Sequence, residues 1–358
     1  MIVFSHITLA LFVCAVFCEE QSEVTTQENK DVFAGKNISR ATMPIVEGKQ
    51  DEILARMKKI RQQASLNSEG KLDVGVRIIK GRLAKKGEFP YQVTVIADED
   101  EICGGSLVTN SHVLTAGHCV FEKNEFELIF GSLNEETADK GSVTLYSNKS
   151  VCHSEYNSTS LENDIAIIYL PKPVKETSLI STVKIPTKSQ ADQVGLPKNY
   201  ATIAGWGRTS DASMDVSQVL KTVDLQIIDN KECLDAFGEG SVSSAQVCAL
   251  GNNGDATCQG DSGGPLVQKF NDENIQIGLV SFGAGEGCEK GFPEVYTRVS
   301  SYLQWISLKT KSTPHSKPSR PKNHKKNNNK KKKQQKKAKK RAKVRMSDPR
   351  KLFQSNNG

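Results

Sequence analysis

Three things are scarce in this sequence of 358 residues: long hydrophobic runs, cysteine between positions 19 and 77, and acidic side chains after position 308. No run reaches the roughly 18 apolar residues of a membrane-spanning helix, which excludes an integral membrane protein built on such helices. Without cysteine, the segment 19–77 cannot be held to the rest of the chain by a disulfide. Because 37% of the residues are hydrophobic and 25% are charged, a wholly disordered chain is also excluded.

The net charge of +7 is distributed unevenly along the chain. Residues 19–77 carry 10 basic and 10 acidic side chains, and residues 78–308 carry 18 basic and 30 acidic side chains. The last segment, 309–358, carries 20 basic side chains and 1 acidic side chain. This tail has too little apolar surface to offset the entropy of folding, so we predict that it is disordered in isolation.

The N-terminus has the pattern of a secretory signal peptide. From Ile7 to Cys18 almost every residue is apolar, and polar acidic sequence begins at Glu19. This length suits the hydrophobic region of a signal. We therefore predict that residues 1–18 are a signal peptide and that the protein is secreted and extracellular. The alternative is a buried strand or helix at the N-terminus.

The remaining cysteines fit an oxidising compartment. Seven of them lie beyond position 18, and this odd count leaves one without an internal partner. Sequons at Asn37, Asn148 and Asn157 are candidate glycosylation sites, as expected for a secreted glycoprotein.

Short β-rich runs separated by turn residues fill positions 78–308. This pattern predicts an all-β domain, a sandwich or barrel of about 230 residues. One helix is expected at its end, over Tyr302–Leu308.

The polar segment 19–77 contains one amphipathic pattern, Asp51–Ala64, with Asp51 as the expected N-cap. The apolar face of this helix would consist of Ile53, Leu54, Met57 and Ile60. The alternative for the segment is a largely disordered linker with one transient helix.

Three local patterns carry side chains suited to nucleophilic catalysis. TAGHC contains His118, NDIA contains Asp164 and GDSGGP contains Ser262. A serine hydroxyl is a poor nucleophile at neutral pH unless a base takes its proton and a third group orients that base. The glycines around Ser262 allow the N–H groups of Gly260 and Ser262 to point at one developing oxyanion. Each residue alone is usually structural, but their order on a β-rich, cysteine-containing chain favours one catalytic site.

Through these motifs, residues 78–308 resemble the chymotrypsin-like (S1) serine peptidase family. The resemblance implies two packed six-stranded antiparallel β-barrels, a C-terminal helix and a catalytic cleft between the barrels. It implies a serine endopeptidase, a hydrolase that acts on protein or peptide substrates. In this enzyme His118 would be the general base and acid, Asp164 would orient it, and Ser262 would attack the peptide carbonyl.

The same resemblance implies three disulfides and leaves one cysteine over. The implied pairs are Cys103–Cys119, Cys233–Cys248 and Cys258–Cys288. The remaining residue, Cys152, is either a buried free thiol or an exposed thiol available for an intermolecular disulfide.

The resemblance also implies a zymogen. Arg77-Ile78 looks like the family's activation site, where an activating protease would cut and release residues 19–77 as a propeptide. The new α-ammonium group of Ile78 would then pair with Asp261, next to Ser262. A buried pair that forms only after cleavage can act as a switch that orders the oxyanion hole.

The specificity pocket departs from the trypsin-like pattern. By the family's motifs, its residues are Ala256, Thr257, Gly283 and Glu294. Ala256 stands where trypsin-like members have aspartate, and Asp255 should point away, because neighbouring residues of an extended segment face opposite ways. Glu294 stands where the family usually has glycine, so its carboxylate would project into the pocket.

Some members of the family carry an acid at this wall and accept both basic and large apolar residues at P1, the residue before the cut bond. We therefore predict a mixed P1 preference for Lys, Arg and large apolar residues. The alternative is a Glu294 that turns out to solvent.

The charge of the tail predicts binding to polyanions by counterion release. Since its one aromatic residue is Phe353, base stacking is not supported, and anionic glycans or cell surfaces are the expected partners. The alternatives are contact with the chain's own acidic domain, removal on maturation, or a solvated tail without a partner. The competing function is a polyanion-binding protein whose peptidase domain is weakly active or inactive.

No cofactor or metal is expected. Some members of the family bind calcium through a loop before the catalytic aspartate. The matching stretch, Gly131–Val143, has no clear acidic pair at its two ends.

Overall fold

The computed structural model describes residues 41–67, 81–99, 101–134, 139–212, 215–252 and 255–311. The predicted signal peptide, the Arg77-Ile78 bond, Asn37 and the basic tail after Lys311 lie outside the described residues. Within the described part, no helix has the length and apolar character needed to span a membrane.

The segment before the domain contains β1 (Ala41–Met43) and α1 (Gln50–Asn67). The first half of the domain contains β2 (Arg82–Leu83), β3 (Gln92–Ala97), β4 (Glu101–Thr109), β5 (His112–Thr115), β6 (Phe126–Phe130), β7 (Val143–Ser147), β8 (Ser150–Cys152) and β9 (Ala166–Tyr169). The second half contains β10 (Tyr200–Gly205), β11 (Lys221–Ile228), α2 (Asn230–Phe237), β12 (Gln246–Gly251), β13 (Pro265–Phe270), β14 (Glu273–Ala284), β15 (Glu294–Arg298), a 3-10 turn (Val299–Tyr302) and α3 (Leu303–Lys311).

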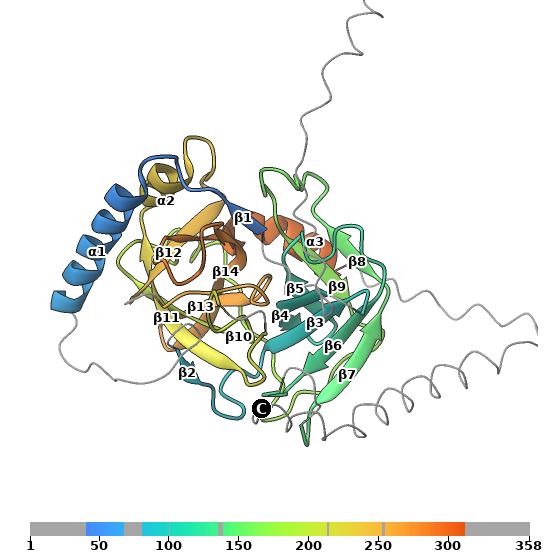
Figure 1. The fold of residues 1–358 in the computed structure, drawn as a ribbon. Helices are drawn as coiled ribbons and strands as arrows, with labels where there is room; N and C mark the ends of the chain where they lie inside the picture. Colours follow the sequence, from blue (N-terminus) through green and yellow to red (C-terminus); the bar gives the residue numbers. More distant parts are fainter. Residues whose placement is uncertain are drawn as a thin grey trace, which may run out of the picture. The chain divides into compact units, whose positions relative to one another are not determined.

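The strands form two sheets, one in each half of the domain (Figure 1). In the second half, β10, β11, β12, β15, β14 and β13 close into a ring of six antiparallel strands. β1 pairs with the end of β14 that extends beyond its pairing with β13, and β2 pairs with the first residues of β11. In the first half, the order β7-β6-β3-β4-β5-β9-β8 forms an antiparallel sheet that curls into a half-barrel. This architecture confirms the predicted all-β, chymotrypsin-like fold.

Each half has its own hydrophobic core, and a third cluster joins the two. Leu114 and Ile167, on β5 and β9, pack in one cluster with Leu279 of β14, Val299 of the 3-10 turn and Ile306 of α3. All five side chains are at most 2% exposed, and burial of one such aliphatic side chain contributes about 1.5–3 kcal/mol. The joint fixes the ends of β5 and β9, which carry two candidate catalytic residues, against the second barrel.

Both predicted helices begin at other residues than expected, and both end three residues later than expected. α3 begins at Leu303 rather than Tyr302, because the preceding four residues form a tighter 3-10 turn. α1 begins at Gln50, and the N–H of Ile53 donates to the carbonyl of Lys49 over 3.0 Å. Asp51 therefore lies inside the first turn and is not the N-cap, although its charge is still favourable at this end of the helix.

The structure forms the three disulfides that the resemblance implied, Cys103–Cys119, Cys233–Cys248 and Cys258–Cys288. Cys152 is a free, half-buried thiol. Burial, reinforced by the charge of Asp164, raises the pKa of this thiol to about 12.

Candidate active site

His118 and Asp164 are direct partners at the end of the first barrel. His118 follows β5, and Asp164 lies two residues before β9. Nδ1 of His118 lies 2.8 Å from Oδ2 of Asp164, and the backbone N–H of His118 donates to Oδ1 over 2.9 Å. Both carboxylate oxygens thus hold one residue, which fixes the position and the tautomer of the imidazole.

The environment of the pair sets its protonation. Asp164 is fully buried and the His118 ring is 9% exposed. Burial acts to lower the pKa of His118, but the charge of Asp164 and its hydrogen bond outweigh it and hold that pKa above the ordinary value. Burial acts to raise the pKa of Asp164, but the same pairing holds it below the ordinary value. Among the described residues, Nε2 of His118 has no hydrogen-bond partner, so this nitrogen is the one available for proton transfer.

Ser281 is a site residue that the sequence analysis missed. Its hydroxyl donates a 2.6 Å hydrogen bond to Oδ2 of Asp164, across the joint between the two barrels. The hydroxyl of Thr297, on β15, donates to the backbone carbonyl of Asp164 over 2.7 Å. The only sequence signal was the position of Ser281 two residues before Gly283, in a segment predicted to line the pocket.

Ser262 lies on a tight, buried loop just before β13. Its carbonyl accepts a 2.7 Å hydrogen bond from the N–H of Gly104, and the sulfur of Cys119 lies 3.6 Å from the same oxygen. Since Cys119 follows His118, these contacts bring the loop of Ser262, the predicted nucleophile, close to His118, the predicted base. The loop needs glycine: Gly263 has a φ of +76°, and a Cβ there would lie 2.2 Å from the hydroxyl oxygen of Thr115.

Asp261 holds the loop on the other side of Ser262. It is 1% exposed, and its two carboxylate oxygens accept 2.8 Å hydrogen bonds from the N–H groups of Gly207 and Cys258. The adjoining Gly260 has a φ of +99°. The assignment of Gly260 and Ser262 as the pair of oxyanion donors stays a prediction.

The predicted pocket residues lie in the second barrel, and the acid among them is buried. Glu294 is 3% exposed, and Ala256 and Thr257 are 4% and 1% exposed. One oxygen of Glu294 accepts from the N–H and the hydroxyl of Thr257, over 2.8 and 2.7 Å. The other oxygen accepts from the hydroxyl of Tyr296 over 2.8 Å. Glu294 is therefore not turned out to solvent, whereas Asp255 is half-exposed.

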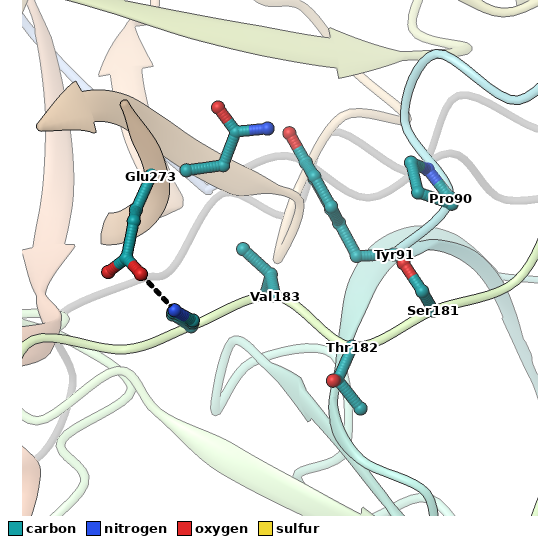
Figure 2. Close-up of a pocket in the computed structure, with 8 residues that line it drawn as sticks. Pro90, Tyr91, Ser181, Thr182, Val183 and Glu273 are labelled. Atoms are coloured by element: carbon teal, nitrogen blue, oxygen red, sulfur yellow. Dashed lines mark hydrogen bonds and ion pairs between the residues drawn. The ribbon is translucent and has the colours of Figure 1, made fainter. Parts of the chain in front are cut away.

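The hollow drawn in Figure 2 is a different place. Its lining includes Pro90, Tyr91, Val183 and Glu273 and none of the three predicted catalytic residues. Glu273 and Lys184, which both line the hollow, form an ion pair. We assign no catalytic role to this hollow.

The described residues contain two clusters of metal-ligand type, Cys103 with His118 and Cys119, and Asp211 with Cys258 and Cys288. The cysteines of both clusters are joined in disulfides, so they supply no thiolates. In the loop Gly131–Val143, the carboxylate of Asp139 accepts from the Leu133 N–H over 2.8 Å and from the Asn134 side chain over 2.7 Å. This acid organises its own loop.

Comparison of the sequence with known proteins identifies the family of this chain. The trypsin family profile matches residues 78–306. Brachyurin of Leptuca pugilator is 37% identical over 237 residues, which cover 66% of this chain and 100% of that protein. Chymotrypsin of Phaedon cochleariae is 35% identical over 242 residues, covering 67% of this chain and 84% of that protein.

A solved structure agrees with these relatives. The structure of HL collagenase matches with a TM-score of 0.59 at 32% identity, covering 65% of this chain and 98% of that chain. The chain therefore belongs to the trypsin family and is a chymotrypsin-like serine endopeptidase.

Proposed function

We propose that this endopeptidase is a secreted zymogen, activated by a protease that cuts after Arg77, and that it accepts Lys, Arg and large apolar residues at P1. The observation that carries the specificity is the buried Glu294 carboxylate, held on Thr257 next to Ala256. The three disulfides support secretion, because such bonds persist in oxidising compartments.

The triad geometry supports an acyl-enzyme mechanism. With Nδ1 of His118 bonded to Asp164, Nε2 takes the proton of the Ser262 hydroxyl while the serine oxygen bonds to the substrate carbonyl carbon. The N–H groups of Gly260 and Ser262 stabilise the oxyanion. When the tetrahedral intermediate collapses, the C–N bond of the substrate breaks, and His118 gives its proton to the departing amine. Water then attacks the acyl carbon, its proton passes through His118 to Ser262, and the acid product leaves.

The pocket chemistry supports two kinds of P1 residue. A carboxylate buried in a narrow site attracts a Lys or Arg side chain, whose positive charge offsets the cost of burying the negative one. Large apolar side chains fill the space beside the methyl group of Ala256 and gain from burial. Because neutral hydroxyl and amide groups already hold Glu294, the carboxylate stays oriented when an apolar guest is bound.

The surroundings of Asp261 support activation at Arg77. The carboxylate is buried one residue before the nucleophile, where the α-ammonium group of Ile78 would be its counter-charge. The family match also begins at residue 78. Formation of this pair would hold the loop that carries Gly260 and Ser262 in its working conformation.

The proposal is tested by hydrolysis of peptides that differ only at P1, with Lys, Arg, Phe, Leu or Ala, by protein cut after Arg77. We expect cleavage after Lys, Arg, Phe and Leu. The Glu294→Gly variant should lose at least about tenfold in kcat/KM for Lys and Arg and keep its rate for Phe. The Ser262→Ala variant is the control without a nucleophile. Cleavage only after Phe and Leu, unchanged in Glu294→Gly, would contradict the specificity.

The second candidate function rests on the basic tail, with 20 basic side chains against 1 acidic one in residues 309–358. In this account the chain binds anionic glycans or cell surfaces, and the peptidase domain is weakly active or inactive. Cut protein that binds heparin but hydrolyses none of the peptides would favour it over the first proposal.

A further inference from the structure

A part of the predicted propeptide lies along β14, the strand that carries Ser281. β1 pairs in parallel with this strand, with Thr42 opposite Gly283. The carbonyl of Met43 accepts from the N–H of Gly285 over 3.0 Å, and the N–H of Ile45 donates to the carboxylate of Glu286 over 2.9 Å. In Figure 1, β1 lies next to β14 on the second barrel.

An apolar anchor follows this strand. Ile45, Ile53 and Met57 are 4%, 5% and 1% exposed and belong to the same cluster as Phe282 of β14 and Ala236 of α2. Leu54 and Ile60 pack against the cluster as partly buried side chains. Four of these five residues form the apolar face predicted for the helix, and Ile45 joins them from the segment before it. Burial of these apolar side chains against the domain favours the bound segment.

Charged groups fix the orientation of α1 on α2. The guanidinium of Arg56 pairs with Glu232 over 2.8 Å and also with Asp235. The side chain of Arg56 is 41% exposed. Because water screens exposed ion pairs, these pairs set the orientation of α1 on α2 more than they strengthen its binding. Lys59, three residues further along the helix, is exposed.

From these contacts we infer that residues 41–60, the propeptide strap, are a built-in competitive inhibitor of the peptidase. An extended peptide that reaches Ser262 past Ser281 and Gly283 needs the edge of β14 for backbone hydrogen bonds, as peptides that add a strand to a sheet do. β1 occupies that edge. The strap therefore has to leave before a substrate can bind.

Cleavage after Arg77 does not by itself remove the strap, an inference that rests on the proposed activation site. Every contact described above is made by residues before position 61, so the cut leaves all of them intact. The segment 19–77 has no cysteine, so no disulfide tethers it once it is cut. The strap should thus remain bound to the activated enzyme without a covalent link and should dissociate on dilution.

The test follows the full-length protein, cut after Arg77, through serial dilution in a peptide assay. We expect the rate per enzyme molecule to rise about tenfold or more on dilution, as the strap leaves. A synthetic peptide of residues 41–67, added back, should raise KM and leave kcat unchanged. Arg56→Glu should lower the affinity of the strap for the domain about tenfold, and Met57→Asp about a hundredfold. Lys59→Glu makes the same charge change on the exposed face of the helix and should leave the affinity unchanged.

A binding measurement separates this inference from the proposed peptidase function. The Ser262→Ala protein, cut by an added protease, is run on a sizing column, and the N-terminal fragment should co-elute with the domain. A fragment that elutes alone, together with rates proportional to enzyme at every dilution, overturns the inference. Co-elution of the fragment, combined with no hydrolysis by the wild-type protein at any dilution, would support binding of the strap and would count against the proposed function alone.

Discussion

The hydroxyl of Ser281 and the carboxylate of Asp164 meet at 2.6 Å across the joint between the two barrels. The oxygen that accepts this bond, Oδ2, is also the one that pairs with His118. The second barrel thus carries both Ser262, the proposed nucleophile, and a hydroxyl donor that orients Asp164 of the first barrel. Docking of the barrels therefore decides the geometry of the triad.

Ser281→Ala should lower kcat/KM about tenfold, because Asp164 loses one of the donors that orient it. The matched control is Ser147→Ala, which removes a buried hydroxyl that donates to the carbonyl of Tyr169 over 2.6 Å, away from the triad. Peptide hydrolysis and thermal unfolding are measured for both variants. An equal loss of activity in the two variants would show that Ser281 has only a structural role.

The pH dependence of kcat/KM should follow the protonation of the His118 imidazole. Only the neutral imidazole accepts the proton of Ser262, so activity is present above the pKa of His118 and is lost as the pH falls through it. Because Asp164 holds that pKa above its ordinary value, the acid limb of kcat/KM should lie at higher pH than the titration of an unpaired imidazole. Asp164→Asn should shift the limb to lower pH and lower kcat about 10⁴-fold. An unshifted limb would contradict the assignment.

Much of the site could be predicted from the sequence because its signals are local. His118, Asp164 and Ser262 each stand in a short motif, and Glu294 follows Pro293 in another. The contact between Ser281 and Asp164 spans 117 residues, and that between Ile45 and Glu286 spans 241. Such pairings are set by how the sheets and barrels pack, which no local pattern encodes.

Cys152 should behave as a protected thiol. Its pKa is raised to about 12, so at pH 8 a thiol reagent should modify it at least about a hundredfold more slowly than a free cysteine. The rate is measured on native protein, with Cys152→Ser as the blank. A dimer on a non-reducing gel that is absent in Cys152→Ser would instead support the intermolecular disulfide.

Deletion of residues 312–358 should abolish retention on heparin at physiological salt and leave kcat/KM for short peptides unchanged. In the full chain, binding should weaken steeply with salt, since many counterions are released on association. A variant of equal length with the tail lysines replaced by glutamine separates charge from length. Undiminished binding by that variant would contradict an electrostatic tail.

The most direct test of the account is covalent labelling of the cut protein with a fluorophosphonate, whose phosphorus is attacked by an activated serine oxygen with loss of fluoride. Mass spectrometry should find one adduct, on Ser262, and the labelling rate should fall about 10³-fold or more in His118→Ala and in protein not cut after Arg77. An adduct at another residue, or equal labelling of Ser262 in His118→Ala, would contradict the assignment of the triad.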